Sequence, residues 1–261
     1  MSFESSIGKL ANNIITEMPE TPAGLSRGFS GGEPYYSTSG VLGSRYDRKD
    51  WPELMALQER DRTSPLHVHQ DYKVPVLNQK STNYCWCFGT VAGVMNRYAK
   101  MDGVAPLLSP AGPACQGKGF SNEGGWGIEA VKYCKKYGIP TQDVWPNCSF
   151  NRDLPEKPDV IESSDLHNVV EFERLDSYDF DGTMSALLDP LNSSPVTLGL
   201  SWWGHLVLGL QGVKYAGEWG IVIVNSWGHT WGEGGYGVLL GDKANPTEAL
   251  VIKSIKPRRV K

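Results

Sequence analysis

Apolar residues after position 85 recur every three or four positions, the period of one buried helix face. We expect this helix to end near Gly103, a suitable C-terminal stop, and Thr82 and Asn83 before it are good N-cap residues. Cys85 would then lie in the first turn, where free backbone N–H groups favour a thiolate and can bind an oxyanion. The apolar set is Phe88, Val91, Ala92, Met95, Tyr98 and Ala99.

The same periodicity predicts three further helices. Residues 4–18 form a short amphipathic helix, 50–53 begin a capped helix that ends near Asp61, and Gly127 begins a helix that stops at Gly138. Residues 19–46 are rich in Gly, Ser, Pro and Thr and indicate an extended arm or linker. Residues 106–120 indicate a loop, because prolines and glycines interrupt them.

Short β-type runs follow from about residue 171, separated by glycine turns. A helical lobe followed by a β lobe is an α+β arrangement, in which we expect the site in the cleft between the lobes. We predict an N-terminal extension over 1–70 and a main domain over 71–261, with the helical lobe at about 80–165 and the β lobe at about 166–255. The runs are 196–200, 206–210, 221–224 and 237–240.

The charge balance excludes several classes of partner. A net charge of −4, from 25 basic and 29 acidic residues, indicates no nucleic acid, and no apolar run approaches membrane-spanning length. The first residues lack a secretory signal, so we expect a cytoplasmic or virion-associated protein with five reduced cysteines. His67 and His69 have no other ligands nearby, so we expect a solvated loop there and no metal site.

A thiol is mostly protonated at neutral pH, so a cysteine nucleophile needs a basic partner. His205 directly precedes the apolar run 206–210, which would fix the position of its ring. Asn225 follows the apolar run 221–224, so it lies at a strand end facing the cleft. The other histidines are His67, His69, His167 and His229.

Four motifs in a fixed order extend this pattern. Gln79 lies six residues before Cys85-Trp86, and the later motifs occupy 122–126 (Asn-Glu-Gly-Gly-Trp), 204–207 (Gly-His-Leu-Val) and 225–228 (Asn-Ser-Trp-Gly). The run 231–236 (Trp-Gly-Glu-Gly-Gly-Tyr) follows the last of them. Over residues 74–240 the chain resembles the papain-like (C1-type) cysteine peptidases. The resemblance implies a papain-like two-lobe fold with the active-site cleft between the lobes, and no metal or organic cofactor.

The resemblance also implies roles for particular side chains. Cys85 is the nucleophile, His205 the acid and base, Asn225 the group that orients His205, and Gln79 an oxyanion donor beside the Cys85 amide. Trp227 would shield the contact between His205 and Asn225. The implied substrate-binding residues are Gly124, Gly125, Trp126, Trp203 and Gly204.

Several residues depart from the family pattern. Thr82 and Asn122 stand where relatives have a disulfide, whereas Cys115 and Cys148 match a second family bridge that could form in an oxidising environment. Gly127 stands where proline is common. Lys80, Asn83 and Tyr84 are larger than the usual residues before the nucleophile, and Trp202 and Trp203 either line the specificity pocket or pack in the core.

Two classes of function follow from these observations. The first is an endopeptidase that hydrolyses peptide or protein substrates through a thioester acyl-enzyme, with other acyl transfers as a weaker variant. The second is a structural protein on a papain-like scaffold, such as a virion component, that assembles through residues 1–46. The leader lacks the long helix of the family's inhibitory pro-segment, so we expect either no autoinhibition or another role such as docking.

Overall fold

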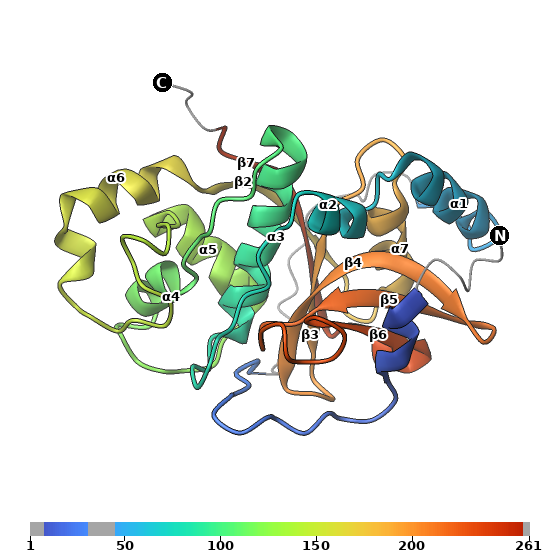
Figure 1. Ribbon diagram of the computed structural model, residues 1–261, viewed down its shortest axis with the longest axis horizontal. Coiled ribbons are helices and arrows are strands. Elements are labelled where there is room, and N and C mark those ends of the chain that lie inside the picture. Colours follow the sequence, from blue (N-terminus) through green and yellow to red (C-terminus); the bar gives the residue numbers. More distant parts are fainter. Residues whose placement is uncertain (1–7, 31–44, 258–261) are drawn as a thin grey trace.

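The computed structural model describes residues 8–30 and 45–257, which form two lobes joined along a central helix (Figure 1). The helical lobe contains α3 (Cys85–Asp102), α4 (Ala111–Gly117), α5 (Gly127–Tyr137) and α6 (Pro158–Leu166). Helix α3 is buried on almost all sides, because α5 covers one side and strands of the β lobe cover another. It ends at Gly103, whose φ of 71° suits a residue without a side chain.

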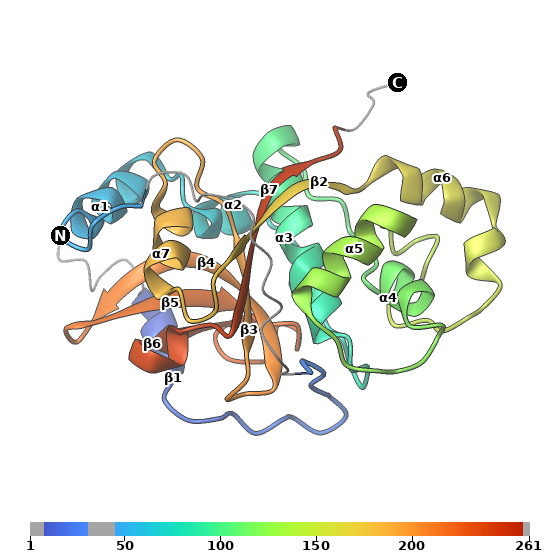
Figure 2. The ribbon, with the colours of Figure 1, turned by 180° about the vertical axis from the view of Figure 1, so that it is seen from behind.

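The β lobe is built on a seven-stranded sheet in the order β1-β6-β5-β4-β3-β7-β2. All neighbouring strands are antiparallel except β1 and β6, which are parallel. Strands β2 and β7 extend from this lobe to the helical lobe beside α3 and α5 (Figure 2). The bounds are β1 (Ile14–Ile15), β2 (Val169–Leu175), β3 (Val196–Leu200), β4 (His205–Tyr215), β5 (Glu218–Val224), β6 (Tyr236–Leu240) and β7 (Glu248–Ile255).

Helices α1 (Trp51–Asp61), α2 (Pro65–Asp71) and α7 (Phe180–Leu188) pack around this sheet. Helix α7 lies on β3 and β4, and α1 packs on α7 with Trp51 and Met55 buried in a second hydrophobic core. Helix α2 lies between α3 and β4. None of the described helices is both long and apolar enough to span a bilayer.

The structure confirms the α+β fold, the central helix, the helices that begin near residues 50 and 127, and the four β runs. The loop prediction for 106–120 is wrong at α4, a short apolar helix that is buried against α5. Strands β2 and β7 and helices α6 and α7 were not predicted. The two strands complete the sheet, because β7 and β2 form one of its edges.

Two predictions for the N-terminal region are wrong. Instead of an amphipathic helix over 4–18, the described part is a 3-10 helix (Gly8–Asn13) followed by β1, and Leu10 and Ile15 are buried against the chain's own body. Residues 1–7 of that prediction lie outside the described residues. The solvated loop at His67 and His69 is instead the buried helix α2, capped by the Ser64 hydroxyl that accepts from the His67 N–H at 3.2 Å. The division at residue 70 remains a prediction.

Candidate active site

Cys85 is the first residue of α3 and is fully buried. Gly89, one turn later, lets this helix approach β4 closely, since a Cβ there would lie 2.4 Å from Cδ2 of Leu206. The predicted capping by Thr82 and Asn83 is wrong, because Tyr84 holds the N-cap position and no described side chain caps it. Thr82 instead donates its hydroxyl to the Gln79 carbonyl at 2.7 Å.

His205 begins β4, and Asn225 follows the end of β5. Their side chains meet at 2.7 Å between His205 Nε2 and Asn225 Oδ1, and Asn225 Oδ1 also accepts the Ser226 N–H at 2.7 Å. The ring of Trp227 lies 4.7 Å from the imidazole, and the ring of Trp203 lies 5.0 Å from it. Because Nε2 donates to Asn225, His205 Nδ1 is the nitrogen free to accept a proton, and it has no hydrogen-bond partner among the described residues.

Two hydrogen bonds fix Gln79 to Ser226 of the β lobe, and a third joins it to Thr82 in its own loop. Its backbone N–H donates to the Ser226 carbonyl at 2.8 Å, and its Oε1 accepts the Ser226 hydroxyl at 2.5 Å. The side-chain Nε2 donates to the Thr82 carbonyl at 2.7 Å and has a second proton for another acceptor. An oxyanion donor needs such a proton, which is the role that the resemblance implies for Gln79. Ser226 was not predicted as a site residue, although it lies inside the Asn-Ser-Trp-Gly motif.

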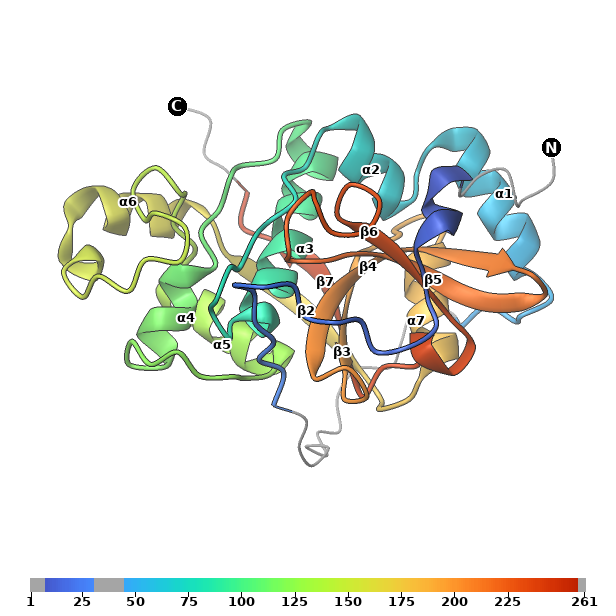
Figure 3. The same cartoon turned by 60° about the horizontal axis from the view of Figure 1, so that its bottom comes forward.

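A segment of the chain's own N-terminal region, residues 16–30, runs along the β lobe and reaches the start of α3, and we call it the arm (Figure 3). Its Gly28 N–H donates to Cys85 Sγ at 3.2 Å. The Ser26 carbonyl accepts both from Gln79 Nε2 at 2.9 Å and from Trp227 Nε1 at 3.1 Å. The arm therefore contacts the sulfur and the predicted oxyanion donor together.

Backbone hydrogen bonds hold the arm to both walls. The Gly125 N–H donates to the Gly28 carbonyl at 2.8 Å, and the Ser30 N–H donates to the Gly125 carbonyl at 3.2 Å, which makes a short parallel bridge. On the opposite wall the Phe29 N–H donates to the Gly204 carbonyl at 3.2 Å. Gly125 and Gly204 thus bind an extended peptide backbone in this structure, and the occupant is the arm.

Two glycines make room for the arm. A Cβ on Gly28 would lie 1.8 Å from the Asn83 carbonyl oxygen, and a Cβ on Gly199 would lie 2.5 Å from the Phe29 ring. The Phe29 ring packs edge-on against Trp126, with 5.1 Å between the ring centroids. Phe29 therefore fills a side-chain pocket between the two lobes. The ring fits there only because Gly199 has no side chain, and the sequence analysis did not single out Gly199.

Burial shifts the pKa values of Cys85 and His205 so that both side chains are favoured in their neutral forms. Burial raises the pKa of the Cys85 thiol to about 11, although the backbone N–H groups of Leu206 and Gly28 oppose the rise. Burial also lowers the pKa of His205 to about 4, against the favourable hydrogen bond from Asn225. The expected thiolate at a helix N-terminus is therefore absent in this state, because desolvation outweighs the stabilising N–H groups.

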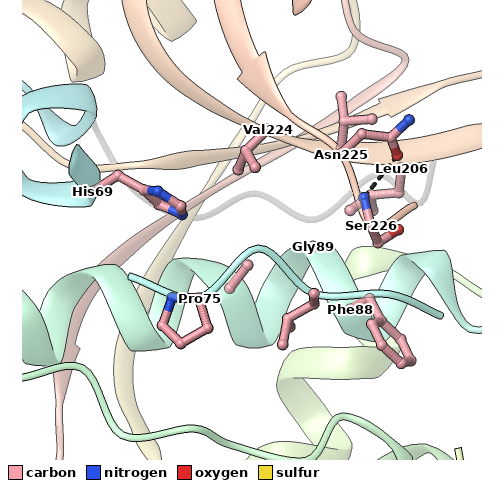
Figure 4. A pocket seen from close by; sticks show the side chains of 11 residues that line it. His69, Pro75, Phe88, Gly89, Leu206, Val224, Asn225 and Ser226 are labelled. Atoms are coloured by element: carbon pink, nitrogen blue, oxygen red, sulfur yellow. Dashed lines mark hydrogen bonds between the residues drawn. The ribbon is translucent and has the colours of Figure 1, made fainter. Parts of the chain in front are cut away.

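A small cavity of about 10 Å³ lies behind the site, between α3 and strands β4 and β5 (Figure 4). Asn225 and Ser226 line one end, and His69 of α2 lines the other. His69 Nδ1 is hydrogen-bonded to the Tyr236 hydroxyl at 2.8 Å. The space suits at most one water, so the back of the site is closely packed.

The remaining predicted residues have distinct places. Gly124 lies against the arm, since a Cβ there would be 2.6 Å from the Gly28 carbonyl oxygen. Trp203 is buried and stacks on Trp202, and its carbonyl accepts from Arg27 Nη1 at 3.0 Å, so its ring belongs to the core while its backbone faces the arm. The five cysteines are free thiols, including Cys115 and Cys148. No cluster of three or more His, Cys, Asp or Glu able to hold a metal occurs in the described part of the chain.

Comparisons with known proteins find relatives among the cysteine peptidases. No protein-family model matches the chain. Pro-cathepsin H of Bos taurus is 26% identical over 194 residues, covering 64% of this chain and 56% of that protein. Papain of Carica papaya is 23% identical over 230 residues, covering 76% of this chain and 61% of that protein. The chain thus spans less than two thirds of either relative.

Solved structures resemble the chain over most of its length. The bromelain protease from Ananas comosus, in complex with the E64 inhibitor, matches with a TM-score of 0.54 and 21% identity over 69% of this chain and 94% of that one. Digestive procathepsin L 3 of the Tenebrio molitor larval midgut matches with a TM-score of 0.55 and 20% identity over 96% of this chain and 78% of that one. The chain has the two-lobe fold of the papain-like cysteine peptidases.

Proposed function

We propose that this protein is a cysteine endopeptidase held in a latent state by its own arm. The observation that carries the proposal is the contact of one extended segment with Cys85, Gln79 and Gly125. An extended peptide already fits between the walls, which is the geometry that a peptide substrate needs. The similarity to pro-cathepsin H and papain supports the same class of reaction.

The arm is bound in a way that opposes its own cleavage. A substrate must present a carbonyl carbon to the sulfur, with its oxygen on the oxyanion donors. The arm presents the Gly28 N–H to Cys85 Sγ, while the carbonyl on Gln79 belongs to Ser26, two residues earlier. The arm is therefore an occupant that must leave before a substrate can bind.

Once the arm has left, His205 Nδ1 accepts the thiol proton and the Cys85 sulfur attacks the substrate carbonyl carbon. Asn225 holds the imidazole through Nε2, which leaves Nδ1 as the nitrogen that accepts the proton. Gln79 and the Cys85 amide bind the developing oxyanion. The C–N bond then breaks, His205 protonates the leaving amine, and water hydrolyses the thioester and restores the thiol.

Displacing the arm in the full-length protein tests this proposal. Gly28→Ala places a Cβ against the Asn83 carbonyl, so we expect the arm to leave and both peptide hydrolysis and labelling of Cys85 by an epoxide inhibitor to rise at least tenfold. Ser30→Ala keeps the N–H that binds Gly125 and should behave as the unmodified protein. Cys85→Ala in the Gly28→Ala background should abolish both signals.

Two outcomes contradict the proposal. One is a Gly28→Ala protein that remains folded and neither labels nor hydrolyses faster than the unmodified chain. The other is hydrolysis that persists after Cys85→Ala. A structural role through residues 1–46 has no specific support, because the described residues of that region, 8–30 and 45–46, pack on the chain's own body. Residues 1–7 and 31–44 lie outside the described part.

A further inference from the structure

Glu248 is a buried carboxylate at the start of β7 that the mechanism does not use. Its side chain crosses from the β lobe to the first residues of α5 in the helical lobe. The carboxylate accepts the Gly127 N–H at 2.7 Å and the Ile128 N–H at 3.1 Å. These are free N–H groups of the first helical turn, whose positive end favours a negative partner.

Gly127 is the residue that makes this contact possible. Proline, which is common here in the family that the chain resembles, has no N–H to donate. A Cβ at Gly127 would also lie 3.0 Å from Cδ1 of Leu250 and 3.1 Å from the Glu248 carboxylate. Gly127 and Glu248 therefore form a matched pair, a donor without a side chain and a carboxylate that reaches it.

The pair lies directly beside the backbone that holds the arm. Gly125 and Trp126 immediately precede Gly127, and both backbone polar groups of Gly125 bind the extended peptide. The Glu248 Cβ also lies near the seat of Phe29, because a Cβ built on Gly199 would meet both Glu248 and the Phe29 ring. Glu248 thus contacts the start of α5, next to Gly125, and also lies beside the pocket that holds the Phe29 ring.

We propose that Glu248 is a positioning residue that fixes the Gly125 edge relative to the β lobe and so sets the affinity of the cleft for an extended peptide. The proposal rests on the peptidase function proposed above. Without the carboxylate, two buried N–H groups lose their acceptor, and the helix start that carries Gly125 can move away from β7. Peptide binding then weakens, whereas the side chains around Cys85 keep their own contacts.

The experiment uses full-length protein in the Gly28→Ala background, so that the cleft is accessible. We expect Glu248→Ala to raise KM for a peptide substrate about tenfold, with kcat changed by less than about twofold. Glu248→Gln retains one acceptor oxygen and should raise KM by only about threefold. Glu173→Ala is the matched control, because it removes another largely buried carboxylate, which pairs with Lys253 on the same sheet at 3.1 Å.

A second measurement makes the result independent of turnover. A synthetic peptide with the sequence of residues 20–30 should bind the Gly28→Ala protein, and Glu248→Ala should raise its Kd by the same factor as KM. Unchanged KM and Kd in folded Glu248 variants would overturn the inference, as would a loss confined to kcat. If no variant hydrolyses peptides, the proposed function fails while the Kd comparison still tests Glu248. If Glu248→Ala does not fold, the Glu248→Gln values replace it.

Discussion

The two walls of the cleft and the arm between them are held by different kinds of interaction. Cys85, His205 and Asn225 lie at the ends of a buried helix and buried strands, and hydrogen bonds within the protein body hold the side chains of Gln79, His205 and Asn225. The arm contributes backbone hydrogen bonds and one aromatic ring, Phe29. The walls are therefore preformed, whereas the arm can be removed without dismantling a core.

The walls and the arm also affect different properties of the site: the walls set the positions of its side chains, and the arm affects their protonation. The hydrogen bond between His205 and Asn225 joins two residues of the β lobe and does not involve the arm. The arm excludes water from Cys85 and His205 and so disfavours both charged forms. Catalytic geometry and catalytic ionisation thus come from different parts of the chain.

The largest effect should come from the pH dependence of Cys85 alkylation. With the arm in place, a thiol pKa of about 11 keeps the sulfur protonated at neutral pH, so the rate should rise only under alkaline conditions. Gly28→Ala admits water and frees His205, which lowers the thiol pKa. We expect the profile of iodoacetamide labelling, followed by intact mass, to move toward acid and the rate at pH 7 to rise about 100-fold.

The control for that measurement is Cys148, which is partly exposed and whose thiol donates to the Gln79 carbonyl at 3.3 Å and not to the arm. Its labelling profile should be the same with and without Gly28→Ala. If the Cys85 profile stays alkaline after the arm has been displaced, burial by the arm is not the cause of the raised thiol pKa.

A smaller effect is expected from the wall itself. In the Gly28→Ala background, Asn225→Ala removes the acceptor at 2.7 Å from His205 Nε2, so the imidazole can rotate away from Cys85. We expect kcat for peptide hydrolysis to fall about tenfold with little change in KM. Asn192→Ala, an exposed substitution, is the control. Equal kcat in the two variants would show that the walls do not orient the imidazole.

The smallest effect concerns the stability of the wall behind Asn225. Burial lowers the pKa of His69 to about 3, so the folded protein keeps this ring neutral while the unfolded chain protonates it below about pH 6.5. The stabilising contribution is complete above that pH and declines as the pH falls toward 3. Urea unfolding at pH 7 and pH 5 should show a loss that His69→Gln reduces by about 2 kcal/mol. The exposed His229→Gln should leave the loss unchanged, and equal losses in all three proteins would contradict this assignment.

Much of the fold could be predicted because local periodicity reports which face of an element is buried. The apolar spacing after Cys85 predicted α3, and the short β runs predicted strands β3 to β6. Helix α2 was missed because it has only seven residues and carries two histidines, a polar pattern that its packing between α3 and β4 overrides. Strand β7 was missed although six of its eight residues are buried, because its partners β2 and β3 are distant in the chain.

The motifs predicted which residues belong to the site, and the structure shows the contacts that these residues make. Gln79, His205 and Asn225 have contacts that suit the expected roles, which remain proposals. The expectation of either no autoinhibition or another role for the leader, such as docking, did not anticipate the arm, because a segment rich in glycine and serine has no periodic pattern to indicate where it lies. The contacts of Glu248 with α5 were equally hidden, since they join residues 121 and 120 positions apart.

The sequence by itself determined the chemical groups, the order of the motifs and the elements that carry them, because these depend on neighbours within one helix turn or one strand. Only the tertiary structure decided that Cys85 is covered and protonated. A pKa depends on the water and dipoles around the group. Burial raises the thiol pKa, and the N–H of Gly28, which lies 57 positions from the sulfur in the chain and 3.2 Å from it in space, partly opposes that rise.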